Sequence, residues 1–304
     1  MNHLARLGAV VGLGLAMAFA AGGAEPKPVR MPSAAEIAKI EQAAPEKPEA
    51  TPAAARKVLV WGRMDAHDPN AYAAKTFEIL GRKTGAFAAT ISEDPDALLA
   101  EKLAGFDAIV MNNIHQPDPF LPKDLAQRPA AEQETLKRRN EAIHKAILDF
   151  VSGGKGLVGI HAATAAFQKW PAYGDLVGGY YVGHLSDDLP MKVEEPGHPV
   201  AAMLGKEFRI RDEIYFFKEP YSRAKLRVLV SLDLSKTADP GKRPDKDYAI
   251  SWVRPYGQGR VFYSTLGHAS TTYWNPAILR HFLAGVQFAI GDLKAEAAPR
   301  AEKP

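Results

Sequence analysis

The chain has 304 residues, of which 46% are hydrophobic, so it is long enough to bury the core of one large domain. Lysine and arginine together number 38, aspartate and glutamate number 35, and the resulting net charge of +3 is spread along the chain. No dense basic face stands out, and we therefore expect no nucleic-acid partner. The sequence contains no cysteine, which excludes disulfides, thiolate metal sites and a cysteine nucleophile.

The first 20 residues have the pattern of a secretory signal peptide. His3 and Arg6 precede an apolar run from Leu7 to Ala21, and Ala18-Phe19-Ala20 offers a cleavage site with small residues. The run is too short to span a bilayer comfortably as a permanent helix. We therefore expect a secreted or periplasmic protein with no membrane span after signal cleavage.

Two segments of low complexity flank the predicted folded unit. Residues 21–56 are rich in Ala, Pro, Glu and Lys, and predict a linker with one short helix opened by a capping box at Ser33 and Glu36. Residues 292–304 have a similar composition and predict a flexible tail. The folded domain is then expected over residues 57–291.

The folded unit begins with strands that alternate with helices. Apolar runs predict strands at Lys57–Trp61, Phe87–Ile91, Asp107–Met111 and Gly156–Ile160. Helical spacing predicts helices over Asn70–Lys83, around Leu98–Leu103 and over Pro129–Val151. This alternation predicts an α/β fold whose sheet is parallel and whose crossovers are right-handed.

The C-terminal half favours extended segments. They are expected at Met191–Glu195, Phe208–Phe217, Leu226–Leu232, Ala249–Arg254 and Arg260–Thr265. The turn Gly257-Gln258-Gly259 is typical of a hairpin, which predicts that the last two segments are antiparallel neighbours. A closing helix is expected from about Asn275 to Ile290.

Four of the nine histidines follow predicted strands, namely His67, His115, His161 and His268. The carboxyl ends of parallel strands meet at one edge of a sheet, where ligands bind, so these side chains can share a cleft. His184 and the pair Asp212-Glu213 can join them. A competing interpretation makes each histidine a hydrogen-bonded structural residue.

Two chemistries fit such a cluster, and the sequence leaves both open. Neutral imidazoles with one carboxylate can hold a divalent metal, for which His161, His184 and His268 are the candidate ligands and His67 an alternative. Otherwise, His161 or His268 serves as a general acid or base that Glu213 orients. Aromatic side chains near the same loops can pack against sugar rings, and Tyr181 and Tyr215 are the better candidates because they adjoin His184 and Glu213.

Four ordered motifs carry a more specific signal. They are Gly153-Gly154-x-Gly156-Leu157-Val158-Gly159-Ile160-His161-Ala162-Ala163, Gly178-Gly179-Tyr180-Tyr181-x-x-His184, Asp212-Glu213-Ile214-Tyr215, and Gly259-Arg260-Val261-Phe262-Tyr263-Ser264-Thr265-Leu266-Gly267-His268. Together they resemble the ThuA-like (trehalose utilisation) family, and the resemblance covers most of residues 57–291. One departure is the first loop, residues 62–68, which is longer than the Gly-x-x-His-Asp form expected of the family.

The resemblance implies a fold similar to class I glutamine amidotransferases, a flavodoxin-like, mostly parallel sheet flanked by helices, with additional antiparallel strands in the C-terminal half. In that architecture the nucleophile occupies the turn after a central strand, a place that His161 fills here, and its histidine partner follows a late strand, where His268 lies. Since there is no cysteine, a cysteine-dependent glutaminase is excluded. The resemblance also implies sugar metabolism, including the catabolism of disaccharides and keto-sugars.

We therefore expect an exported carbohydrate-processing protein that acts on a glycoside, a disaccharide or a keto-sugar. The candidate catalytic residues are His161, His268 and Glu213. The candidate substrate-binding residues are His67, Asp68, His115, Tyr181, His184 and Tyr215. The alternative is a non-catalytic sugar-binding or accessory module on the same scaffold. The cofactor stays open, with a divalent metal as one candidate, and so does the oligomeric state.

Overall fold

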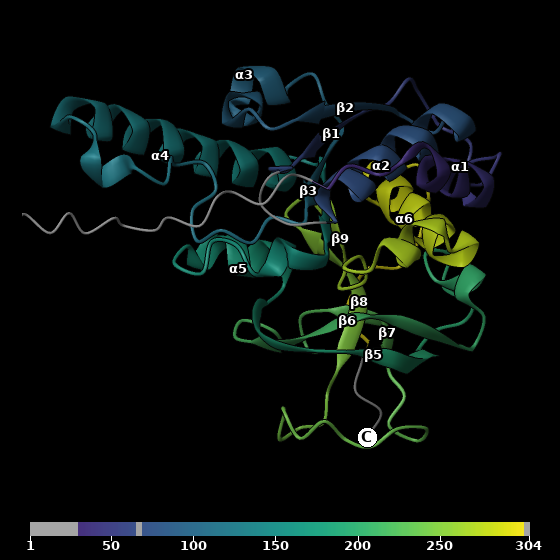
Figure 1. Cartoon of the computed structure of the whole chain (residues 1–304). Coiled ribbons are helices and arrows are strands. Elements are labelled where there is room, and N and C mark those ends of the chain that lie inside the picture. The colour runs from purple at the N-terminus through teal and green to yellow at the C-terminus, as the bar shows by residue number, and fades with distance from the viewer. Residues whose placement is uncertain (1–29, 65–68, 301–304) are drawn as a thin grey trace, which may run out of the picture.

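The computed structural model describes residues 30–64 and 69–300, and within them the chain forms a nine-stranded sheet of order β2-β1-β3-β4-β9-β8-β7-β5-β6 (Figure 1). The parallel part consists of β1 (Lys57–Trp61), β2 (Ala88–Ser92), β3 (Ala108–Asn112), β4 (Gly156–Ile160) and β9 (Gly259–Ser264). With β9 as the fifth strand, this is the strand order of flavodoxin-like sheets. The predicted α/β class is therefore confirmed.

The antiparallel part is inserted in the sequence between β4 and β9. It consists of β5 (Tyr180–Val193), β6 (Glu207–Lys218), β7 (Arg227–Leu232) and β8 (Ala249–Tyr256). The predicted hairpin is confirmed, since β8 and β9 pair on either side of residues 257–258. The predicted start of β5 at Met191 is wrong, because the strand begins at Tyr180 and pairs with β6 along most of its length.

Helices cover both faces of the parallel strands. They are α1 (Ala34–Ala43), α2 (Asn70–Thr84), α3 (Ala100–Leu103), α4 (Ala130–Ser152), α5 (Pro171–Val177) and α6 (Pro276–Ala289). Short 3-10 helices lie at Pro95–Leu98 (η1), Leu125–Gln127 (η2), His161–Thr164 (η3), Ala202–Leu204 (η4) and Ser270–Trp274 (η5). Figure 1 shows α1, α2 and α6 on one side and α3, α4 and α5 on the other.

Two apolar cores follow from the alternation of side chains along each strand. In β1, Val58 and Val60 pack into the core beneath α2 and α6, whereas Leu59 and Trp61 pack into the core beneath α4 and α5. A strand buried on both faces needs a continuous apolar sequence, which is why β1, β3 and β4 read as apolar runs. The sheet is thus fixed on both faces, and its carboxyl edge is a stable base for polar loops.

The segment before β1 packs against the domain. The Gln287 side chain on α6 accepts hydrogen bonds from the backbone amides of Glu49 and Ala50, at 2.7 and 3.1 Å, and donates to the Ala50 carbonyl. Arg56 forms an ion pair of 2.6 Å with Asp292. The predicted short helix is present as α1, opened by the predicted capping box at Ser33.

Residues 292–300, which belong to the predicted flexible tail, contact the domain at several points. The His198 ring bonds to the Glu296 carbonyl oxygen at 2.8 Å, and Arg300 pairs with Glu195 at 2.7 Å. Arg227 also donates to the Ala298 carbonyl at 3.0 Å. These partners lie about 70 to 105 positions away in the sequence, so local composition carries no trace of them.

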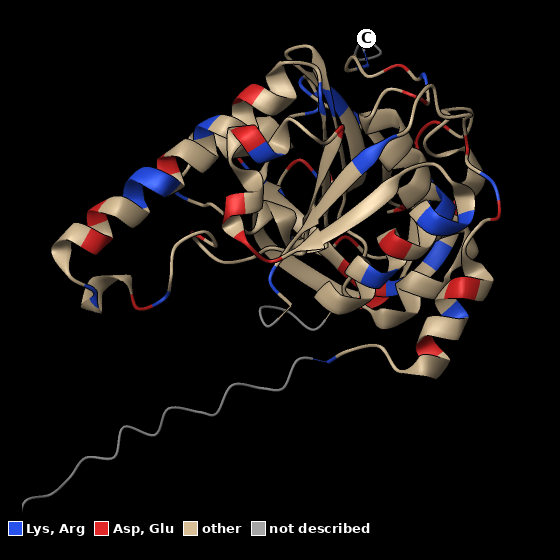
Figure 2. Cartoon of the chain, turned by 90° about the horizontal axis from the view of Figure 1, so that it is seen from above, with Lys and Arg blue, Asp and Glu red and all other residues tan. Residues whose placement is uncertain are grey.

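Charges on the surface alternate in sign. Along α4, Arg138 pairs with Glu134 and Lys145 pairs with Asp149, one helical turn apart. Figure 2 shows basic and acidic residues interspersed along this helix. The absence of a nucleic-acid partner stays a prediction. In residues 30–64 and 69–300, no helix has both the length and the apolar character needed to cross a bilayer.

Candidate functional site

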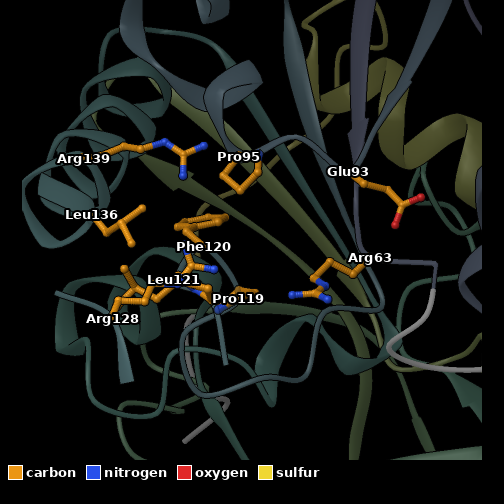
Figure 3. Close-up of a pocket in the computed structure, with 10 residues that line it drawn as sticks. Arg63, Glu93, Pro95, Pro119, Phe120, Leu121, Arg128, Leu136 and Arg139 are labelled. Atoms are coloured by element: carbon orange, nitrogen blue, oxygen red, sulfur yellow. The ribbon is translucent and has the colours of Figure 1, made fainter. Parts of the chain in front are cut away.

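One cavity, of about 350 Å³, lies beside α4 and the loops after β1 and β2 (Figure 3). Its floor is apolar, with Phe120 and Leu121, and three arginines stand around it. Arg128 donates hydrogen bonds to Asp124 and Glu132, at 3.0 and 2.6 Å. Arg139 is paired with Asp96. Because these two cations are already paired with carboxylates, the cavity is a weak candidate for an anion site.

The other cavity of interest opens where β4 ends at His161. His161 has a backbone φ of +46°, in the left-handed region that residues other than glycine seldom adopt. The neighbouring strand β3 is followed by Asn113, which has a φ of +50°. Such conformations cost of order 1 kcal/mol and persist where the surrounding structure holds them. Here the turn places the His161 ring at the carboxyl edge of the sheet, as predicted.

The hydrogen bonds of His161 fix which ring nitrogen faces Tyr215 and Glu213. Nδ1 lies 2.7 Å from the Thr265 carbonyl oxygen, which can only accept, so Nδ1 carries the proton. Nε2 lies 3.0 Å from the Tyr215 hydroxyl and 3.4 Å from Glu213 Oε2. In the neutral ring, Nε2 therefore presents its lone pair toward Tyr215 and Glu213.

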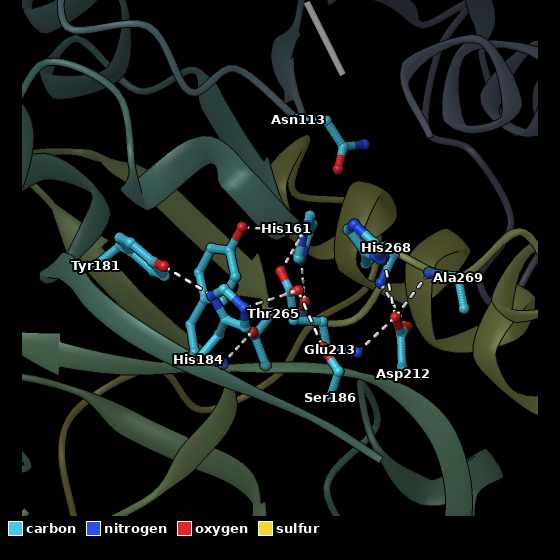
Figure 4. Close-up of polar contacts among 12 residues, drawn as sticks. Asn113, His161, Tyr181, His184, Ser186, Asp212, Glu213, Thr265, His268 and Ala269 are labelled. Carbon is cyan, nitrogen blue, oxygen red and sulfur yellow. Dashed lines mark hydrogen bonds and ion pairs between the residues drawn. The ribbon is translucent and has the colours of Figure 1, made fainter. Parts of the chain in front are cut away.

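The β5–β6 ribbon supplies the opposite wall. Ser186 pairs with Glu213 and His184 pairs with Tyr215, and because side chains alternate along a strand these four lie on one face. The Ser186 hydroxyl donates to Glu213 Oε1 at 3.1 Å, and His184 Nε2 lies 3.4 Å from the same oxygen. The Tyr181 hydroxyl bonds to His184 Nδ1 at 2.8 Å (Figure 4).

The charge state of Glu213 follows from its neighbours. Burial acts to raise the pKa of the carboxyl, but the neighbouring imidazoles of His161, His268 and His184 lower that pKa to about 2. Glu213 is therefore ionised at neutral pH, and it serves as a base, a ligand or a counter-charge rather than as a proton donor. Burial raises the pKa of the Tyr215 hydroxyl, which stays protonated.

Asp212 positions the loop that carries His268. Its Oδ1 accepts hydrogen bonds from the amides of Glu213, His268 and Ala269, at 2.8, 3.0 and 2.8 Å. Its Oδ2 accepts from the Gly267 amide at 2.8 Å and from the Thr272 hydroxyl at 2.6 Å. Only 4% of Asp212 is exposed, so one buried carboxylate joins β6 to the loop after β9.

His161, Glu213 and His268 converge, as the sequence predicts. One nitrogen or oxygen atom from each lies within 4.8 Å of the other two. The imidazole centroids of His161 and His268 are 5.3 Å apart. Figure 4 shows the two rings near one another, with Asp212 beneath the His268 loop. We call these three residues the triad.

Glu213 and His268 of the triad line a cavity of about 650 Å³, and the fully buried His161 contacts Glu213. The cavity is lined by His115, Ala165, Gln168, Tyr181, Val182, His184, Glu213, Tyr215, Lys218 and His268. The predicted substrate-binding residues His115, Tyr181, His184 and Tyr215 therefore share it. Burial lowers the pKa of His115, and the nearby imidazole of His161 lowers it further, so the neutral form of His115 is favoured. The candidates His67 and Asp68 lie outside the described residues.

Several residues of the site were not singled out from the sequence. Ser186 had a usable signal, because it lies two positions after His184 on the same strand face. Thr265 holds two parts of the site, since its carbonyl accepts from His161 and its hydroxyl accepts from the Tyr215 amide at 2.9 Å. Asn113 is fully buried, and its Oδ1 has no hydrogen-bond partner among the described residues. The contacts of Thr265 and the burial of Asn113 leave no mark in the local sequence.

Comparison with known proteins settles the family. The ThuA model, described as trehalose utilisation, matches residues 57–289. The chain belongs to the ThuA family. No curated protein matches it.

Solved structures of ThuA-like proteins have the same fold. A ThuA-like protein of Bacteroides uniformis is 21% identical, with a TM-score of 0.59 over 81% of this chain and 93% of that chain. One from Parabacteroides merdae is 16% identical, with a TM-score of 0.55 over 79% and 91%. A Salmonella typhimurium protein described as cytoplasmic is 13% identical, with a TM-score of 0.53 over 77% and 98%. At these identities the likeness concerns the fold alone.

The Asp212 contacts predict the effect of Asp212→Asn. In the variant, an NH₂ group replaces one carboxylate oxygen and faces amide or hydroxyl donors with which it cannot form hydrogen bonds. The free energy of unfolding should therefore fall by roughly 3 kcal/mol. Urea unfolding measures this loss. Asp187→Asn is the matched control, since Asp187 is the exposed cross-strand partner of Asp212 and should change stability by less than about 0.5 kcal/mol. Equal stability of the two variants would contradict the positioning role.

Proposed function

We propose that this ThuA-family protein is an exported enzyme that processes a carbohydrate in the cleft of the triad. The observation that carries the proposal is the convergence of an ionised carboxylate and several imidazoles on one cavity with an aromatic wall. Imidazoles and a carboxylate gathered in a concave site commonly serve in proton transfer or metal ligation. The family description, trehalose utilisation, supports a sugar as the substrate class.

The cavity suits a saccharide in size and in lining. Its volume of about 650 Å³ lies within the range of small-molecule sites. The rings of Tyr181 and Tyr215 are 4.4 Å apart at 59°, and the adjacent Val182 is 55% exposed. This wall offers apolar contact to the C–H face of a sugar ring. Gln168, Lys218 and His115 supply polar groups around it for the hydroxyls.

The charge pattern favours a keto-sugar over glycoside hydrolysis by paired carboxylates. That hydrolysis requires two carboxyl groups, one of them protonated at working pH. Among the described residues that line the cavity, Glu213 is the one acidic side chain, and its pKa of about 2 keeps it ionised. The lone pair on His161 Nε2 can take up a proton or coordinate a cation, and the Glu213 carboxylate stabilises either positive charge.

Turnover of a saccharide panel tests the proposal. The panel contains trehalose, other disaccharides and their keto forms. His161→Asn, chosen because asparagine tolerates a positive φ, and Glu213→Gln should each lower kcat by about 10² to 10⁴ while the fold is retained. Arg139→Gln, in the separate cavity beside α4, should leave turnover unchanged. Binding of sugars with no turnover across the panel would favour the non-catalytic module instead.

Export is a separate proposal, which rests on the signal-peptide pattern of the first 20 residues, a segment outside the described ones. Mass spectrometry of protein from the periplasm or the medium should find an N-terminus near Ala21 or Glu25. Protein found there with Met1 intact would contradict cleavage.

A further inference from the structure

We propose that the triad binds a divalent transition-metal ion, held by His161 Nε2, the Glu213 carboxylate and an imidazole nitrogen of His268. The inference deepens the proposed function, because it rests on the same cleft and assigns the chemistry of that site. Two imidazoles and one carboxylate form a donor set that suits zinc and its first-row neighbours. With no cysteine in the chain, thiolate ligands are excluded.

The spacing of the triad fits a coordination shell. Two ligand atoms bound to one tetrahedral ion at 2.0–2.1 Å lie about 3.3 Å apart. His161 Nε2 and Glu213 Oε2 are 3.4 Å apart, so these two atoms already have the required separation. The three ligand atoms all lie within 4.8 Å of one another, and the exposed His268 side chain can close the remaining gap by a rotamer change.

The contacts behind the triad are those that orient metal ligands. A metal-bound histidine commonly donates its other ring N–H to a backbone carbonyl or a carboxylate, which fixes the tautomer. His161 does this through Nδ1 to the Thr265 carbonyl at 2.7 Å. Glu213 Oε1 accepts from the Ser186 hydroxyl at 3.1 Å, so Oε2 is left to face His161. The His268 backbone is held by Asp212.

Metal binding exchanges one hydrogen bond for a stronger contact. Without an ion, the lone pair on His161 Nε2 accepts from the Tyr215 hydroxyl at 3.0 Å. A bound cation takes that lone pair, and the tyrosine hydroxyl is then available to a ligand of the ion. His161 becomes a ligand rather than a proton acceptor. His184, whose Nε2 lies 3.4 Å from Glu213 Oε1, is a remaining imidazole for proton transfer.

A bound ion would place a strong positive charge at the substrate. The described residues around the triad provide such a charge only weakly. Such an ion polarises a sugar carbonyl or lowers the pKa of a bound water. Lys218 also lines the cavity, but the triad itself presents imidazole nitrogens and carboxylate oxygens. Coordination gathers these lone pairs around one centre.

Metal titration of the full chain without an affinity tag tests the inference. Protein freed of metal with a chelator is titrated with Co²⁺ followed by visible absorption, and with Zn²⁺ followed by calorimetry. We expect one ion per chain. Glu213→Gln and His268→Asn should each weaken binding by at least roughly 100-fold, since loss of a ligand exceeds loss of an outer-shell partner. Thermal melts without metal show that the variants fold.

His144→Gln is the control, because it removes a histidine that stacks on Trp170 at 3.8 Å and does not line the cavity of the triad. It should bind metal as the wild type does. Absence of binding by the wild type, or unchanged affinity in both triad variants, would overturn the inference. Saccharide turnover is measured separately. If the chain binds no metal and turnover still depends on His161, the metal assignment fails and the proposed function stands; if the triad binds metal and no sugar turns over, the proposed function fails.

Discussion

The site depends on one buried carboxylate that holds two distant parts of the sheet together. By hydrogen-bonding order, β6 is an edge strand, separated from β9 by β8, β7 and β5. The sheet must therefore curl for β6 to reach the loop after β9. Asp212 joins the two, because its oxygens accept hydrogen bonds from the amides of residues 267–269. The Tyr215 amide adds a second link to the Thr265 hydroxyl at 2.9 Å.

This closure explains why neighbouring acidic residues have different tasks. Successive side chains on a strand point to opposite faces, so Asp212 and Glu213 on β6 cannot serve the same partner. Asp212 is turned to the amides of the His268 loop, where a fixed negative charge is satisfied by five donors. Glu213 is turned to His161 and His184, where its charge faces the cavity. Asp212 therefore positions the His268 loop, whereas Glu213 faces the cavity.

The parallel half of the sheet contributes a rigid, preformed turn. His161 and Asn113 follow adjacent strands and both have a left-handed backbone. Tyr273 ties this edge to the His268 loop, because its hydroxyl donates to the Gly267 carbonyl and lies 3.3 Å from Asn113 Nδ2. The strained turns are therefore held from several sides, and the His161 ring has little freedom to leave the cleft.

The parallel strands and the convergence of the triad were predictable from the sequence. β1 and β4 are short apolar runs closed by glycine or histidine, and the carboxyl ends of such strands share one edge. The start of β5 was not predictable in the same way, because glycines and a bulge between Tyr181 and Gly183 interrupt its alternation. The positioning role of Asp212 was not predictable either, because its partners are mostly backbone amides, which every residue except proline has.

The most direct test of the account is a crystal structure of the full chain grown with trehalose or its keto form. The account predicts a sugar in the cleft, with a ring face against Tyr181 and Tyr215. It also predicts a sugar oxygen within about 3 Å of His161 Nε2 or of an ion held by the triad. Sugar bound only elsewhere, such as in the cavity of Phe120 and Arg128, would contradict the assignment of this cleft as the active site.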